Sequence, residues 1–150
     1  MVIQDIQLGR VALPLRHPFR TALRTVESIE DVVVRVVADS GEVGYGEAPP
    51  TAVITGDTLG SIECAIRDFI RPSLLGMEVE DLDGIMGRLH NCIVKNTSAK
   101  AAVDMAVYDL YGKRFGAPGG SWRPTSPSRW APSTKWSGTA WRPWSGGTGP

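Results

Sequence analysis

An abrupt change of composition at Gly116 divides this chain of 150 residues into two unequal parts. The first 116 residues hold all sixteen acidic residues and twelve of the sixteen basic ones, which gives a net charge of −4. The last 34 residues hold four basic residues and no acidic one, which gives a net charge of +4. The zero net charge of the whole chain therefore hides two segments with different folding properties.

The second part has a composition that cannot build a core. It contains no Val, Ile, Leu, Phe or Met, and its six prolines and six glycines oppose regular secondary structure. Too little apolar surface is present to offset the entropy of ordering such a segment. We therefore expect one folded domain over residues 1–118 and a disordered, low-complexity tail over residues 119–150. All five tryptophans of the chain lie in this tail: Trp122, Trp130, Trp136, Trp141 and Trp144.

Charge, hydropathy and cysteine content exclude several classes of protein. The zero net charge argues against nucleic-acid binding by the whole chain. No apolar run approaches the roughly 18–20 residues of a membrane helix, and the first ten residues lack the pattern of a signal peptide. We therefore expect a cytoplasmic protein that binds neither nucleic acid nor membrane. Cys64 and Cys92 lie among apolar residues, so we expect two buried, reduced thiols.

The first part of the chain begins with a pattern typical of strands. Residues 3–15 alternate loosely between apolar and polar, and residues 29–38 contain a β-branched run. Turn-forming residues at 39–42 lead into a third short strand over 43–48. Gly44 and Gly46 are spaced as in a dinucleotide-binding loop, but no helix follows them, so a hairpin strand is the better interpretation. Short connections between the second and third strands favour an antiparallel β-meander.

Helical periodicity then replaces the alternation. Apolar residues recur three and four apart over residues 59–74, with Asp57 as a plausible N-cap and Pro72 expected to end or kink the helix. The side chains predicted to form its apolar face are Leu59, Ile62, Ile66, Phe69, Ile70 and Leu74.

Two more helices complete the predicted domain. One runs over residues 82–93 and is entered through Asp81, and the other runs over residues 98–115. Thr97 is expected to cap the start of the last helix, Gly116 suits the left-handed residue after its end, and its many alanines permit close approach to a neighbour. The predicted fold class is α+β, a three-stranded antiparallel β-meander followed by a three-helix bundle.

The residues that usually carry chemistry are sparse. His17 and His90 have no partner at the spacing of metal ligands, so we predict neither a catalytic residue nor a metal site in this chain. The acids within residues 78–83 complement a helix dipole. Asp104 and Asp109 lie within the last helix, where buried structural hydrogen bonds are the expected role.

Two connections are candidates for binding. Residues 17–25 form a long predicted loop with two arginines and one phenylalanine, and an arginine there can form a bidentate pair with a substrate carboxylate. The alternative is a solvated loop whose arginines bind nothing. A second candidate loop spans residues 49–57.

Three segments together resemble a known family. They are HPFRTALRT in the first loop, GYGEAPPTAVITGDT at the third strand, and SAKAAVDMAVYDLYGKRFGAP in the last helix. In this order and spacing, residues 1–118 resemble the N-terminal capping domain of the enolase superfamily, in its mandelate racemase and muconate-lactonizing subgroup. Within that subgroup the likeness is greatest to dipeptide epimerases of the L-Ala-D/L-Glu type.

The resemblance implies a mechanism and a set of roles. Such enzymes abstract a proton next to a carboxylate with a lysine base, and Mg²⁺ stabilises the enediolate. Those groups lie on a C-terminal (β/α) barrel, which the capping domain covers with its first two loops. By position, Arg24 would meet the side-chain carboxylate of an acidic dipeptide. Phe19, Ile54 and Thr55 would line the closed site, so these four residues are expected to bind substrate.

The chain departs from the family after Pro118. A barrel of this kind needs at least about 200 residues, and the acid-free tail offers neither the metal ligands nor the paired lysines of the family. We therefore expect no Mg²⁺ site here and no activity of this chain alone. A frame shift is our hypothesis for the tail, because a wrong reading frame in GC-rich codons supplies its residue types.

Two other interpretations stay open. The chain could be a non-catalytic binding module that uses its basic, Trp-rich tail to contact a partner. Alternatively, the cap could meet a separately encoded barrel, and the apolar face that a barrel would cover could then cause self-association.

Overall fold

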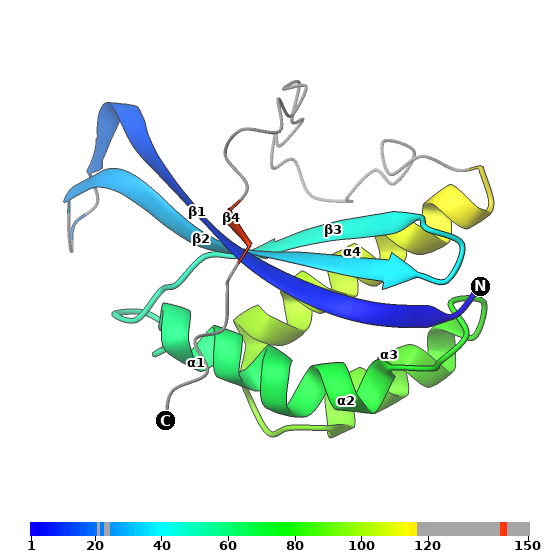
Figure 1. The fold of residues 1–150 in the computed structure, drawn as a ribbon. Coiled ribbons are helices and arrows are strands. Elements are labelled where there is room, and N and C mark those ends of the chain that lie inside the picture. The colour runs from blue at the N-terminus through cyan, green and yellow to red at the C-terminus, as the bar shows by residue number, and fades with distance from the viewer. Residues whose placement is uncertain (21, 23–24, 117–141, 144–150) are drawn as a thin grey trace, which may run out of the picture.

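A computed structural model describes residues 1–20, 22, 25–116 and 142–143 of the chain. Most of the predicted tail over residues 119–150, and Arg24 among the predicted binding residues, lie outside the described residues. The described part is an antiparallel sheet with its helices on one face (Figure 1). This is the α+β architecture predicted from the sequence, with three strands followed by helices.

The sheet consists of β1 (Ile3–Arg20), β2 (Thr25–Ala38), β3 (Val43–Ala48) and the two-residue β4 (Arg142–Pro143), in the order β3-β2-β1-β4. The meander β1-β2-β3 confirms the predicted connectivity. Strand β4, which pairs with Gly9 and Arg10, is a short regular element within a segment where the composition predicted none.

Strands β1 and β2 are longer than predicted, and the long loop expected at residues 17–25 is wrong. The two strands stay paired from Ile3↔Ala38 to Arg20↔Thr25, with an irregularity between Pro14 and Phe19. Their outer halves extend past the helices as a two-stranded arm (Figure 1). Pro18 lies in the part of β1 that was predicted as a loop, but β1 is at the edge of the sheet over most of its length, and a proline is tolerated on an edge strand.

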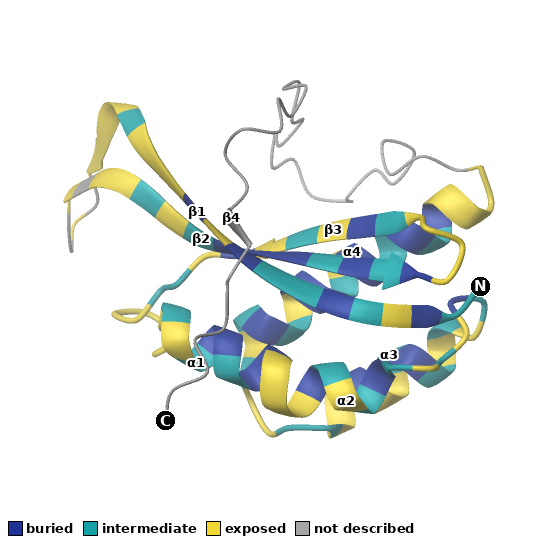
Figure 2. Ribbon diagram, viewed as in Figure 1, coloured by how far each residue is buried: buried dark blue, intermediate teal, exposed yellow. Residues whose placement is uncertain are grey.

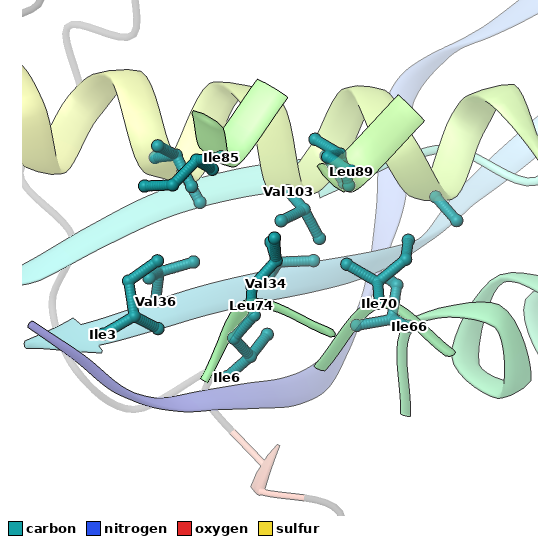
Figure 3. Packing of buried hydrophobic residues seen from close by; sticks show 14 of the residues in the cluster. Ile3, Ile6, Val34, Val36, Ile66, Ile70, Leu74, Ile85, Leu89 and Val103 are labelled. Atoms are coloured by element: carbon teal, nitrogen blue, oxygen red, sulfur yellow. The ribbon is translucent and has the colours of Figure 1, made fainter. Parts of the chain in front are cut away.

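The core lies between the sheet and the helices (Figure 2). Alternate valines of β2 point to the helices because successive side chains of a strand face opposite sides. They pack against residues of the helices and of β1, as Figure 3 shows for part of the cluster. Fully buried members include Ile3, Val32, Val34, Val36, Ile66, Ile70, Leu74, Ile85, Leu89 and Val103.

The first predicted helix is three consecutive pieces: α1 (Leu59–Cys64), the π-helix η1 (Ala65–Ile70) and α2 (Arg71–Leu74). The predicted bounds are correct, but Pro72 does not end the helix. Pro72 has no N–H for the α-helical bond, and the turn before it widens so that the Arg71 N–H bonds to the Ile66 carbonyl five residues back. Phe69, expected on the buried face, is 46% exposed, because Ile66, Ile70 and Leu74 carry that face at intervals of four.

Caps differ from prediction at two helix starts. Thr58 caps α1 in a reciprocal capping box with Ser61, so Asp57 is not the N-cap. Helix α4 (Thr97–Arg114) follows a left-handed Asn96, and Thr97 is its first residue and not its cap. The Asp81 side chain caps α3 (Leu82–Asn91) as predicted, and Gly116 is left-handed with φ +66.

Helix α4 packs closely on β3, which confirms the role predicted for its small residues. A Cβ placed on Gly46 would lie 1.9 Å from the Ala102 carbonyl oxygen, and one on Gly44 would lie 1.9 Å from that of Ala106. Only glycine fits at these two strand positions.

Two further observations concern the cysteines and the length of the helices. Cys64 and Cys92 are free thiols, but each is half-buried and not buried as expected. Among the described residues no helix has the length and apolar character needed to cross a membrane.

Candidate functional site

The two candidate binding segments lie at the same end of the molecule. The arm formed by the outer halves of β1 and β2 extends from the sheet, and the connection between β3 and α1 emerges beside its base (Figure 1). We call this connection, residues 49–58, the β3–α1 loop. It takes that place because Ala48, the last residue of β3, pairs with Val32 where the arm begins.

Large apolar side chains are exposed on both segments. Phe19 on the arm is 62% exposed, and Val53 and Ile54 on the β3–α1 loop are 65% and 70% exposed. Leu13, nearer the base of the arm, is also half exposed. These side chains contribute little to the core, so their apolar surface is free to contact another molecule.

The structure places three of the four predicted binding residues at this end. Phe19 pairs across the arm with Val26, and Ile54 and Thr55 lie in a turn of the β3–α1 loop. Arg24 lies in the connection between β1 and β2, outside the described residues. The geometry thus brings both segments to one end.

The β3–α1 loop is held in shape by a short internal turn. The backbone N–H groups of Ile54 and Thr55 both donate to the Thr51 carbonyl at 2.8 Å. The hydroxyls of Thr51 and Thr55 lie 2.7 Å apart and form a further hydrogen bond. Gly56 then reverses the chain with φ +83, a backbone conformation that glycine adopts without steric cost. The turn presents Ile54 outward.

Asp57 joins this loop to helix α4. Its carboxylate Oδ2 accepts hydrogen bonds from the Thr55 hydroxyl at 3.1 Å and from the Ser98 hydroxyl at 2.7 Å. Its backbone N–H donates to the Thr55 hydroxyl at 3.3 Å. Asp57 is 91% buried, in keeping with a carboxylate that is hydrogen-bonded within the protein. Sequence reasoning found Asp57 but gave it the wrong role, and it found no signal for Ser98.

An ion pair fixes the base of the arm to α1. The Arg10 guanidinium donates to both carboxylate oxygens of Glu63, at 2.5 and 2.7 Å. The Glu63 side chain is only 11% exposed, and the hydrogen bond to its carboxylate raises the pKa of Arg10. The two residues are 53 positions apart, so no local pattern could reveal this pair.

Of the remaining titratable candidates, His17 lies on the arm, and Asp104, Asp109 and His90 lie on helices α4 and α3. The Asp109 carboxylate accepts from the backbone N–H of Tyr45 at 2.9 Å and pairs with Lys113, so its role is structural as predicted, although these contacts are exposed and not buried. The expectation fails for Asp104, because its buried Oδ1 has no hydrogen-bond partner among the described residues. Burial raises the pKa of the Asp104 carboxyl. His17 and His90 are exposed, on β1 and α3 respectively.

The described residues do not fit a magnesium site. No three His, Cys, Asp or Glu side chains among them gather closely enough to hold a metal ion. Several carboxylates are engaged in ion pairs instead: Glu63 with Arg10, Asp5 with Arg71, and Asp109 with Lys113.

Comparison with known proteins identifies related sequences over the folded part. Residues 4–119 match the family model described as mandelate racemase / muconate lactonizing enzyme, N-terminal domain. The chain is 54% identical over 118 residues to the L-Ala-D/L-Glu epimerase of Clostridium acetobutylicum, an alignment that covers 79% of this chain and 33% of that enzyme. The chain thus spans about a third of the length of the curated relatives it matches.

Solved structures of related proteins also match most of this chain. The substrate-liganded L-Ala-D/L-Glu epimerase from Bacillus subtilis superposes with a TM-score of 0.74 at 49% identity, over 77% of this chain and 32% of that one. A dipeptide epimerase from Enterococcus faecalis, complexed with Mg and the dipeptide L-Leu-L-Tyr, superposes with a TM-score of 0.72 at 30% identity, over 77% and 32%.

Proposed function

Since the chain belongs to the mandelate racemase / muconate lactonizing enzyme family and matches its N-terminal domain, we propose that residues 1–118 form the capping domain of a dipeptide epimerase. The observation that carries the proposal is the common end of the arm and the β3–α1 loop, where Phe19 and Ile54 expose apolar surface. Two projecting segments at one end suit a domain that closes over a site built by another domain.

The proposed substrate is a dipeptide with an acidic side chain. Arg24 would bind the side-chain carboxylate, because a guanidinium offers two parallel N–H donors to a carboxylate. Phe19, Ile54 and Thr55 would border the bound dipeptide and exclude water from it. All four are specificity residues in this proposal, and none of them transfers a proton.

The proton transfer would require a barrel domain. A solved relative is complexed with Mg and a dipeptide, which supports the proposal that a barrel domain would hold Mg²⁺ and that the ion would stabilise negative charge on the substrate. We propose that the 150 residues alone are inactive and that the cap functions only with a barrel. Its own residues would bind and enclose the substrate.

A fusion protein tests this proposal. Residues 1–118 would replace the first domain of the Bacillus subtilis epimerase, in front of that enzyme's barrel. We expect the fusion to epimerise L-Ala-L-Glu in the presence of Mg²⁺, measured as exchange of the α-proton in D₂O by NMR. A soluble, folded fusion without exchange would contradict the proposal.

Arginine variants of the fusion protein test the role of Arg24. We expect Arg24→Met to raise the KM for L-Ala-L-Glu by at least about tenfold, because a charge-assisted bidentate contact is lost. Arg20→Met, at the end of β1, is the matched control and should leave KM nearly unchanged. Equal effects of the two variants would remove Arg24 from the proposed site.

A further inference from the structure

We propose that Asp57 is a positioning residue that fixes the β3–α1 loop to helix α4 and thereby sets where Ile54 and Thr55 lie. The inference rests on the proposed function, because that function assigns these two side chains to the substrate. It adds Asp57 and Ser98, neither of which lies among the four residues proposed to bind substrate.

The contacts form a continuous path from α4 to the start of the loop. The Ser98 hydroxyl donates to Asp57 Oδ2, the Thr55 hydroxyl donates to the same oxygen, and the hydroxyls of Thr55 and Thr51 are hydrogen-bonded. Ser98 is 41 residues away from Asp57 in sequence, so the path joins two separate elements. Hydrogen bonds to a charged acceptor are roughly twice as strong as neutral ones.

An aspartate directly before a helix usually caps it, but another residue caps α1. Thr58 caps α1, its hydroxyl accepts from the Ser61 N–H, and the Ser61 hydroxyl accepts from the Thr58 N–H. The Asp57 carboxylate therefore does not cap α1, and its bonds to Thr55 and Ser98 connect the loop to α4. Burial of this carboxylate is offset by these contacts.

Ile54 depends on this path because it has little packing of its own. Its side chain is 70% exposed, and the turn that carries it is closed by bonds to the Thr51 carbonyl. Gly56, at φ +83, separates the turn from Asp57 and adds no side-chain contact. Removing the Ser98 hydroxyl should therefore loosen the loop without touching a proposed substrate contact.

Amide hydrogen exchange on the full 150-residue chain tests the path directly. The amides of Ile54, Thr55 and Asp57 are hydrogen-bonded within the loop and serve as reporters. We expect Ser98→Ala to speed their exchange by about tenfold, as the loss of one charge-assisted bond predicts. Amides of the β2–β3 pairing should be unchanged.

Conservative and distant variants sharpen the test. Ser98→Thr keeps the hydroxyl and should restore slow exchange, and Asp57→Asn should loosen the loop like Ser98→Ala. Ser73→Ala is the control, because its hydroxyl bonds to the Phe69 carbonyl within a helix. Unchanged loop exchange in Ser98→Ala, or faster exchange throughout the domain, would overturn the inference.

Kinetics of the fusion protein separate this inference from the proposed function. Ser98→Ala should raise the KM for L-Ala-L-Glu more than it lowers kcat, with Ser98→Thr close to the unmodified fusion. An inactive unmodified fusion would refute the proposed function, while hydrogen exchange would still decide whether Asp57 holds the loop. If the fusion is active and Ser98→Ala loosens the loop without raising KM, the positioning role of Asp57 is overturned.

Discussion

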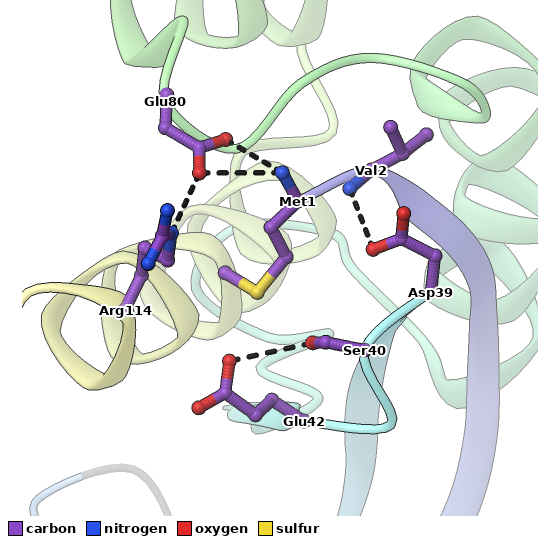
Figure 4. Close-up of polar contacts among 7 residues, drawn as sticks. All are labelled: Met1, Val2, Asp39, Ser40, Glu42, Glu80 and Arg114. Atoms are coloured by element: carbon purple, nitrogen blue, oxygen red, sulfur yellow. Dashed lines mark hydrogen bonds and ion pairs between the residues drawn. The ribbon is translucent and has the colours of Figure 1, made fainter.

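The Arg114 guanidinium donates to the Glu80 carboxylate at 2.8 Å, which joins the last turn of α4 to the segment before α3. The same carboxylate accepts from the amino group of Met1 at 3.1 Å (Figure 4). Both positive groups favour the ionised carboxylate, and the hydrogen bond from Arg114 contributes most to lowering the pKa of Glu80 to about 2. The start of β1 and the end of α4 are thus connected through one side chain.

This contact predicts an acid-dependent loss of stability. A depressed carboxyl pKa adds stability at pH values above the ordinary value of 4.5, and that stability is lost as the pH falls from 4.5 to about 2. We expect Glu80→Gln to lower the urea midpoint at pH 7 and to flatten its decline between pH 4.5 and 2. Parallel pH profiles of the two proteins would contradict this.

The close contact between β3 and α4 predicts that Gly46 tolerates no side chain. In Gly46→Ala the new Cβ would overlap the Ala102 carbonyl oxygen, and the helix would have to move. We expect a loss of about 3 kcal/mol in the free energy of unfolding, measured in urea.

Gly87 provides the matched control for that substitution. It lies in α3, it is exposed, and a Cβ there meets no atom within 4 Å. Gly87→Ala should stabilise the domain by about 0.5–1 kcal/mol, because alanine is the better helix former. Similar losses at both glycines would show that the contact at Gly46 is not responsible.

The ion pair at the base of the arm predicts strong coupling between its members. Arg10→Met leaves the buried Glu63 carboxylate without its charged partner, and we expect a loss of about 1–3 kcal/mol in unfolding free energy. The double variant Arg10→Met with Glu63→Met should recover most of that loss. Additive losses in a double-mutant cycle would argue against coupling.

The buried Asp104 oxygen without a hydrogen-bond partner among the described residues predicts that replacing this side chain stabilises the domain. Burial raises its carboxyl pKa, although the nearby positive charge of His90 opposes the shift, so the ionised form is less favourable in the fold than in the unfolded chain. Asp104→Asn should therefore raise the free energy of unfolding at pH 7 by up to about 1 kcal/mol. The gain should shrink as the pH falls toward 3.8, because both states then become protonated. A loss of stability at pH 7 in thermal or urea unfolding would refute this account.

The exposed apolar side chains predict self-association of the 150-residue chain. Substituting Phe19→Ser and Ile54→Ser together should lower the average mass measured by sedimentation at high protein concentration. Val94→Ser is the control, because Val94 is 82% exposed but lies in the connection between α3 and α4. If the unmodified chain and every variant sediment as monomers, self-association through Phe19 and Ile54 is excluded.

Most of the fold follows from local patterns in the sequence. Strand β3, the bounds of the first helical region and the cap at Asp81 were all predictable, because each depends on residues that are neighbours in the chain. The arm was not, because β1 contains two prolines, both strands have few buried residues there, and they are held by cross-strand pairing. The π-helix before Pro72 was not predictable either, because the position of a proline in the sequence does not show whether the helix ends there or widens by one residue.

The candidate site was predicted only in part. A resemblance to a known family supplied Phe19, Ile54 and Thr55, and the structure brings their segments to one end. The contacts that hold those segments in place, Arg10 with Glu63 and Asp57 with Ser98, join residues 53 and 41 positions apart. Such pairs have no spacing rule in the sequence, so only the folded arrangement reveals them.

The exposed position of Phe19 and Ile54 has an evolutionary consequence. Substitutions at exposed sites usually change unfolding free energy by no more than about 0.5 kcal/mol, a small part of the about 5–15 kcal/mol that keeps a domain folded. Mutations at these two positions can therefore accumulate and be tested by selection while the hydrophobic core is left intact. A scaffold arranged in this way can diversify the proposed binding surface with little risk of losing its fold.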